Sequence, residues 1–137
     1  MDTGETCIEE PMDHGHNDCE ACETARAYGS FPTAFQAVAD HVHAIAHSKG
    51  WWKGDRNDGE MIALMHSELS EALEGLRHGN PASDHIPTFT AAEEELADVI
   101  IRIMDFAQAK QHRVAQAVMA KIAFNRTRPY MHGGKKF

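Results

Sequence analysis

The chain has 137 residues, 42% of them hydrophobic and 25% charged, which fits one globular domain and excludes a collagen-like or wholly disordered chain. No apolar run approaches the ~20 residues that span a bilayer, and the acidic N-terminus is not a secretory signal. Three cysteines give no disulfide framework. We therefore expect a cytoplasmic protein without a membrane partner. The net charge of −8 argues against binding to nucleic acid.

Charge divides the chain into two parts. Residues 1–30 hold eight acidic residues and one basic residue, so this segment carries −7 of the net charge. It lacks helical periodicity, and we interpret it as an acidic extension that is disordered or forms a small zinc-binding element. Residues 31–137 form the expected domain, and because no acidic residue follows Asp105, that domain ends in a basic tail.

The extension contains the side chains of a candidate Zn²⁺ site, namely His14, His16, Cys19 and Cys22. Cys19 and Cys22 have the spacing of a zinc knuckle, but no second Cys-x-x-Cys pair follows. An acidic tail without a metal is the interpretation that the pattern favours, and redox chemistry is the third alternative.

The first two expected helices are bounded by capping patterns. Residues 33–36 read Thr-Ala-Phe-Gln, the spacing of a capping box, and predict a helix from Thr33 to about Lys49, ended by Gly50. Residues 57–60 form a weaker box for a second helix that ends at residues 77–78, before Gly-Asn-Pro.

A third and a fourth helix follow. Residues 90–93, Thr-Ala-Ala-Glu, open the third helix. A single helix from there to Arg126 would be too long for a compact domain, so we place a break at residues 110–112 and end the fourth helix near Asn125. Strand alternation is absent from the sequence, which predicts an all-α, four-helix bundle-like domain.

Two acidic pairs carry the chemistry. Glu68-Leu-Ser-Glu71 and Glu95-Leu-Ala-Asp98 each place two acids on one face of a helix, a turn apart. Both pairs flank an apolar stripe, and we expect these stripes to pack together as the core; they comprise Ile62, Met65, Leu69, Leu73 and Leu76, and Val99, Ile100, Ile103 and Ala107.

Packed stripes would bring the four carboxylates together. Mutual repulsion would then raise their pKa values unless divalent cations bound them, and oxygen ligands suit Mg²⁺ or Mn²⁺. The alternative for each pair is a solvated helix face. A di-iron centre is not expected, because neither pair has histidine at the fourth position. His43 and His47 also have metal-compatible spacing, but ordinary polar roles suit them better.

The order and helical context of the acidic pairs resemble the MazG-like, all-α nucleoside triphosphate pyrophosphohydrolases. The resemblance covers Phe31 to the C-terminus. Residues 50–52 and 63–67 support it, as do Lys121, Asn125, Arg126, Arg128, Pro129 and residues 132–135. Residues 111–113 lack the glycine and the acid that members often have in this turn.

The resemblance implies Mg²⁺-dependent hydrolysis of (deoxy)nucleoside triphosphates to monophosphate and pyrophosphate, by metal-activated water attack at the α-phosphorus. Glu68, Glu71, Glu95 and Asp98 would hold the metal, and the first two would also act in catalysis, with Glu71 a candidate to orient the water. Two alternatives stay open: a phosphoribosyl-ATP pyrophosphohydrolase, and a non-catalytic oligomeric bundle that binds metal or nucleotide.

The substrate contacts expected from this resemblance lie outside the acidic pairs. Trp51 or Trp52 would stack on the base, although either is equally suited to be a packing anchor. The candidate phosphate-binding residues are Lys121, Asn125, Arg126, Arg128 and Lys135. A single four-helix unit would leave a shallow site, so we expect a homodimer or homotetramer, as in the relatives.

Overall fold

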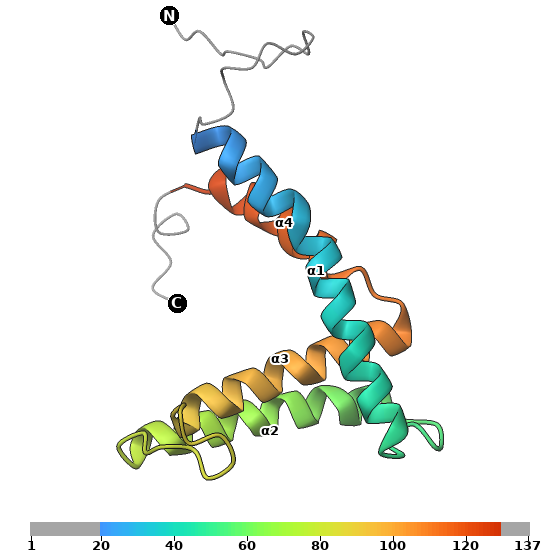
Figure 1. The fold of residues 1–137 in the computed structure, drawn as a ribbon, viewed down its shortest axis with the longest axis vertical. Coiled ribbons are helices and arrows are strands. Elements are labelled where there is room, and N and C mark those ends of the chain that lie inside the picture. The colour runs from blue at the N-terminus through green and yellow to red at the C-terminus, as the bar shows by residue number, and fades with distance from the viewer. Residues whose placement is uncertain (1–19, 130–137) are drawn as a thin grey trace, which may run out of the picture.

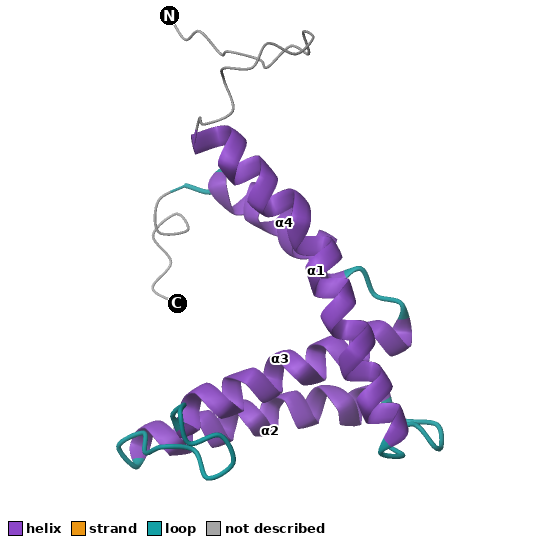
Figure 2. Ribbon diagram, in the orientation of Figure 1, coloured by secondary structure: helices purple, strands orange, loops and turns teal. Residues whose placement is uncertain are grey.

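A computed structural model describes residues 20–129 of the chain. This part consists of four helices, α1 (Glu20–Ser48), α2 (Asp58–Arg77), α3 (Ala91–Lys110) and α4 (Val114–Arg126) (Figure 2). Apart from one isolated bridge between Ala82 and Thr90, the described residues contain no β-structure, so the all-α prediction is confirmed. Within the described residues, none of the helices has the length and apolar character needed to cross a membrane.

The caps predicted from the sequence start two helices, α2 and α3. The Asn57 side chain accepts a hydrogen bond from the Glu60 backbone N–H and starts α2. Thr90 and Glu93 form a reciprocal capping box at the start of α3. Gln111 adopts the left-handed conformation with a φ of 56° and separates α3 from α4, where a break was predicted.

The predicted start of the first helix is wrong. The Thr33 pattern lies inside α1, which begins at Glu20 and continues through Pro32. A proline inside a helix removes one backbone hydrogen bond, so local packing must compensate. The rings of Phe31 and Phe35, one turn apart, pack at a centroid distance of 5.8 Å across this position, and α4 packs against α1.

The helices form two arms (Figure 1). In one arm, α2 and α3 lie side by side and antiparallel. The C-terminal part of α1 crosses the C-terminal part of α3, and the N-terminal part of α1 runs beside α4 in the second arm. The arrangement places α4 away from the middle of α2 and α3.

The interface between α2 and α3 is narrow and contains small residues. A Cβ atom built on Gly75 would lie 3.2 Å from the Ala91 side chain, so glycine permits the close approach of the helices. Met61, Met65 and Ala72 are buried on α2.

The polar loop that joins the helices is anchored by the Asn80 side chain, which accepts a hydrogen bond from the Ala92 N–H.

The predicted core stripes are wrong for most of their members. Leu69 and Leu73 are 44% and 48% exposed on α2, and Ile100 is 52% exposed on α3, whereas Ala107 of the α3 stripe is buried. Met65 is the one residue of the predicted α2 stripe that is buried. The interface follows Met61, Met65, Glu68 and Ala72 instead, about a quarter turn from the leucines at ~100° per residue.

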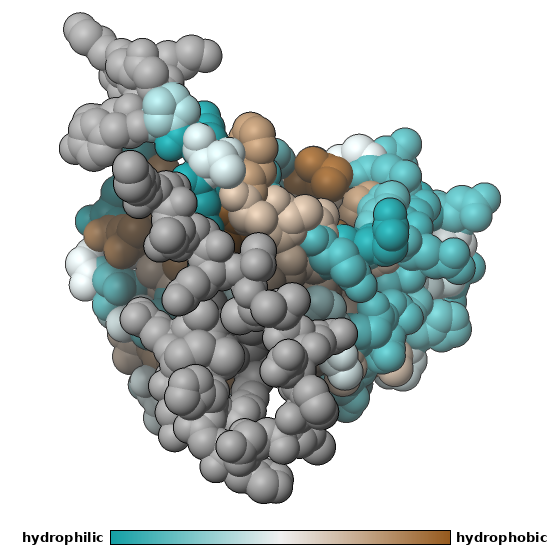
Figure 3. Space-filling view, turned by 90° about the horizontal axis from the view of Figure 1, so that it is seen from above, coloured by the Kyte–Doolittle hydropathy of each residue, from teal (hydrophilic) through white to brown (hydrophobic). Residues whose placement is uncertain are grey.

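This rotation gives the α2–α3 hairpin two different faces. On both helices the exposed leucines lie on one side of the interface and the acidic pairs lie within it or on the other side. Because the helices are antiparallel, an equal rotation places both apolar stripes on the same face of the hairpin. Large apolar side chains outside the hairpin are exposed as well, among them Val38, Ile45 and Phe124, and the space-filling view shows brown apolar areas on the surface (Figure 3).

Candidate functional site

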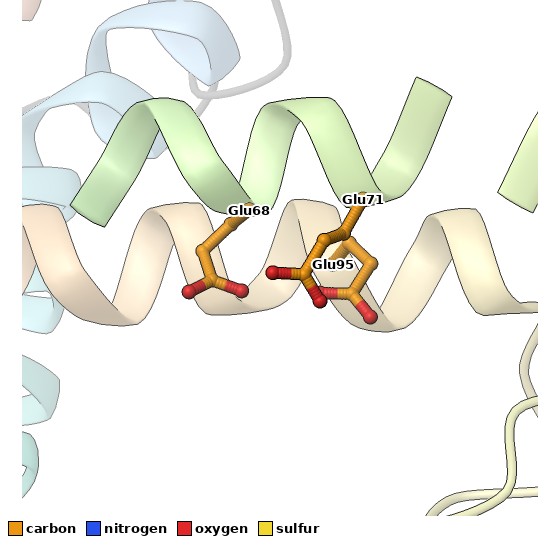
Figure 4. Close-up of side chains that lie close together, drawn as sticks. All are labelled: Glu68, Glu71 and Glu95. Carbon is orange, nitrogen blue, oxygen red and sulfur yellow. The ribbon is translucent and has the colours of Figure 1, made fainter. Parts of the chain in front are cut away.

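Three of the four predicted metal ligands form one cluster in the middle of the hairpin. Glu68 and Glu71 of α2 and Glu95 of α3 each offer a carboxylate oxygen, and these atoms lie within 4.8 Å of one another (Figure 4). Glu68 is buried, Glu95 is half-buried and Glu71 is exposed. The cluster is therefore anchored in the helix interface and open to solvent at Glu71.

Asp98, the fourth predicted ligand, lies beside this cluster on α3. Its position three residues after Glu95 places it one turn along the same helix. Burial, followed by the charge of Glu68, raises the pKa of Asp98, while the charge of Arg102 opposes the rise. Asp98 therefore belongs to the electrostatic environment of the cluster without being part of its close triad.

The cluster carries more negative charge than it can stabilise alone. Burial, contact with the Glu68 carboxylate and the charges of Glu71, Glu68 and Asp98 raise the pKa of Glu95 from 4.5 to about 7. Carboxylates that crowd in this way either retain a proton or bind a cation. Oxygen atoms alone form the donor set, and this suits a hard cation such as Mg²⁺ or Mn²⁺.

Arg102 is a site residue that the sequence analysis missed. Its Nε and Nη2 atoms lie 2.7 Å and 2.5 Å from the same Glu68 oxygen, Oε1. It follows Asp98 by four residues and so shares a helix face with it. That spacing was the available signal, but only the pairing of α2 with α3 shows that Glu68 is its partner.

A pocket of about 340 Å³ adjoins the carboxylates. Its apolar wall comes from the C-terminal part of α1 and from Ile101, and its polar lining includes Asp98, Arg102 and Asp105. Trp51 lines the opening and is 58% exposed. Asp98 and Arg102 line the pocket, and Arg102 also contacts Glu68 of the cluster, so these two residues connect the pocket with the cluster.

The two tryptophans have different surroundings. The Trp52 indole donates its N–H to the buried Asp105 carboxylate at 3.0 Å, and its ring packs on His43, whose Nδ1 lies 2.7 Å from the same carboxylate. Trp52 is thus a packing anchor. The Arg56 guanidinium lies at similar distances from both ring centroids, 5.5 Å from Trp51 and 5.4 Å from Trp52. Exposure distinguishes them, and the exposed Trp51 is the better candidate for stacking on a base.

The sequence analysis also missed Asp105, whose contact with His43 shows the role of that histidine. Asp105 lies seven residues after Asp98, two turns along the same face, a spacing that was visible in the sequence. The His43 side chain is committed to Asp105 and contacts the His47 ring edge-on at 6.3 Å. The ordinary polar role expected for this pair fits the structure better than metal binding.

Three of the predicted phosphate-binding residues, Lys121, Asn125 and Arg126, belong to α4, which lies away from the α2–α3 hairpin (Figure 1). Lys121 lies over the Phe124 ring at 4.6 Å, and Arg126 lies over the Tyr28 ring at 5.8 Å. Asn125 and Arg128 are exposed. Within one copy of the chain, the structure does not bring these residues to the cluster, and Lys135 lies outside the described residues.

The candidate zinc site cannot be placed on the structure. His14, His16 and Cys19 lie outside the described residues, and Cys22 lies in the first turns of α1, where the backbone alone is described. The zinc hypothesis stays a prediction.

Comparison with known proteins gives no match: no family model fits the chain, and no curated protein or solved structure is significantly similar to it.

Proposed function

We propose that the protein is a Mg²⁺-dependent pyrophosphohydrolase that converts (deoxy)nucleoside triphosphates to monophosphates and pyrophosphate. The observation that carries this proposal is the convergence of the acidic pairs of α2 and α3 beside a pocket with an exposed tryptophan. The resemblance to MazG-like enzymes rests on the same acidic pairs and favours the same function.

In this proposal, different residues of the chain bind the metal, orient the water and contact the base. Glu68, Glu71, Glu95 and Asp98 would hold Mg²⁺, with Mn²⁺ as a substitute. The bound ion would supply Lewis-acid neutralisation of phosphate charge and an acidified water. Glu71 is the most exposed carboxylate of the triad, and this supports the expectation that it orients a water and accepts its proton. Trp51 would stack on the base in the pocket, at the end remote from the phosphates.

The exposed leucine face supports an oligomer. Several large apolar side chains of α2 and α3 lie on one face of the hairpin and stay uncovered by the described residues: Ile62, Leu69, Leu73, Leu76, Leu96 and Ile100. A contiguous apolar face of this kind is typical of a protein–protein interface. We propose that a second copy covers it in a homodimer, or in pairs within a homotetramer. The opposite face keeps the carboxylates open to substrate.

A hydrolysis panel tests the function. Purified protein is incubated with each of the eight common triphosphates and with phosphoribosyl-ATP, with Mg²⁺ or with EDTA, and pyrophosphate and orthophosphate are measured separately. We expect Mg²⁺-dependent pyrophosphate release from at least one nucleoside triphosphate. Turnover of phosphoribosyl-ATP alone would identify the neighbouring activity, and no turnover of any substrate would support the non-catalytic bundle.

Matched variants test the site. Glu68→Gln and Asp98→Asn should each lower kcat by at least about 100-fold, since each removes a charged ligand of the metal that stabilises the transition state. Glu74→Gln is the control, because Glu74 lies on the same helix but is exposed and pairs with Arg77. Activity like that of the wild type in both site variants would reject the metal assignment.

The position of the isotope tests the bond that is cleaved. With the carboxylate-held metal nearest the α-phosphorus, hydrolysis in ¹⁸O-labelled water should place the label in the nucleoside monophosphate. Label in free orthophosphate, together with accumulating diphosphate, would contradict attack at the α-phosphorus even if the acids were essential.

A further inference from the structure

Arg102 occupies an unusual position, because it is a cation inside a group of carboxylates that suit a metal ion. Two of its guanidinium nitrogens contact one oxygen of the buried Glu68, and it follows Asp98 by about one turn of the same helix. Among the described residues, no other lysine or arginine forms an ion pair with the four acids. Among the described residues, Arg102 is therefore the counter-ion of this group.

The same guanidinium faces the pocket. The Arg102 side chain is 34% exposed and lines the pocket together with Asp98 and Trp51. It lies on α3 between the carboxylate cluster and the space that would receive a nucleotide. Arg102 can therefore exchange its partner by side-chain rotation, without movement of a helix.

Charge balance gives a reason for such an exchange. A divalent cation held by Glu68 competes with Arg102 for the same oxygen, so the Arg102–Glu68 contact weakens when the cation binds. A triphosphate brings new negative charge to the pocket, and the planar guanidinium matches phosphate oxygens in a bidentate manner. The residues of α4 that were predicted for this role lie elsewhere in the copy that is described.

We propose that Arg102 is the phosphate-binding cation of this site. Without a metal ion it pairs with Glu68, and when a divalent cation binds Glu68 instead, the guanidinium contacts the polyphosphate chain of the substrate. The phosphate half of this inference rests on the proposed function. The competition between Arg102 and the cation rests on the contact with Glu68 alone. The two halves therefore have separate measurements.

The experiment compares Arg102→Met with Arg102→Lys and with the control Arg77→Met. Arg77 is exposed and pairs with Glu74 on the surface of α2. Mn²⁺ binding to each protein without nucleotide is measured by calorimetry. Binding of a non-hydrolysable α,β-imido triphosphate, and separately of inorganic tripolyphosphate, is then measured at saturating Mn²⁺. Circular dichroism checks that each variant is folded.

Loss of the competing charge should tighten Mn²⁺ binding by Arg102→Met about 5-fold. The same variant should bind the analogue and tripolyphosphate about 10- to 100-fold more weakly, since charge-assisted hydrogen bonds are lost. Arg102→Lys should keep the Mn²⁺ affinity of the wild type and lose part of the affinity for phosphate. If Arg102→Met does not fold, this lysine variant decides the phosphate role. Arg77→Met should match the wild type in every measurement.

The outcomes separate the inference from the function. If the wild type, Arg102→Met and Arg102→Lys all bind the analogue with the same affinity, Arg102 does not bind phosphate. The proposed function would then stay intact. Unchanged or weaker Mn²⁺ binding by Arg102→Met would overturn the competition between Arg102 and the cation. Wild-type protein that binds Mn²⁺ but neither phosphate ligand would reject the proposed function, and with it the phosphate role.

Discussion

Replacing Glu95 with glutamine tests the electrostatics of the carboxylate cluster directly. Glutamine keeps the shape of the side chain and removes its charge at every pH. In the folded, metal-free protein the pKa of Glu95 is raised from 4.5 to about 7. The folded state therefore binds more protons than the unfolded state between pH 4.5 and about 7. The free energy of unfolding of the wild type should fall as the pH rises through this window and then stay low.

The size of the effect follows from the pKa. One pKa unit corresponds to roughly 1.4 kcal/mol, so the difference between 4.5 and about 7 sets an upper limit of about 3 kcal/mol. Glu95 is half-buried, and solvent screening reduces this to an effect on the order of 1–2 kcal/mol. Glu95→Gln should thus match the wild type near pH 4.5 and exceed its stability by that amount at pH 8.

Urea denaturation in EDTA, followed by circular dichroism at pH 4.5, 6, 7 and 8, measures this difference. Adding Mg²⁺ at pH 8 should stabilise the wild type and have a much smaller effect on Glu95→Gln, because the variant lacks one ligand. Glu74→Gln controls for the loss of an exposed carboxylate from the same hairpin. Equal pH profiles for Glu95→Gln and the wild type would refute the crowding of charge that we infer at the cluster.

Three further expectations concern the remaining features. Trp51→Ala should raise KM for the triphosphate without changing the melting temperature. Trp52→Ala should destabilise the fold by about 2–4 kcal/mol, because packing and a hydrogen-bond partner of Asp105 are lost. Steady-state kinetics and thermal melts compare the two variants, and equal effects would contradict their different roles. Leu69→Glu should dissociate the oligomer, as measured by analytical ultracentrifugation, and an unchanged mass would show that this face is not the interface. Gln111→Gly should stabilise the protein by about 0.5–1 kcal/mol in urea denaturation, since glycine adopts the left-handed conformation without strain, and a loss of stability would show that the Gln111 side chain contributes more.

Local signals in the sequence predicted the helix ends well. The caps at Asn57 and Thr90 depend on hydrogen bonds between a side chain and a backbone only three residues away, so the sequence alone contains both partners. The same reasoning failed at Thr33. A capping pattern cannot start a helix where tertiary packing continues the preceding one, and here α1 packs against α4.

The candidate site was predicted in part for a similar reason. The spacing of each acidic pair follows from one helix, and three of the four acids do converge. The partner of Arg102 depends on how α3 is aligned with α2, and the partners of Asp105 come from α1 and the following turn. The predicted stripes failed because apolar residues show which face of a helix avoids water, not which neighbour covers it.

The position of the carboxylate cluster within a single hairpin has a consequence for folding kinetics. Residues 58–110 are contiguous, and α2 packs against α3, the next helix along the chain, so this hairpin is built from local contacts and should form early. Ionised glutamates at its interface oppose this step, while a divalent cation favours it. A cation bound at this cluster would therefore also speed the assembly of the hairpin, and a substitution that weakens metal binding should slow folding as well.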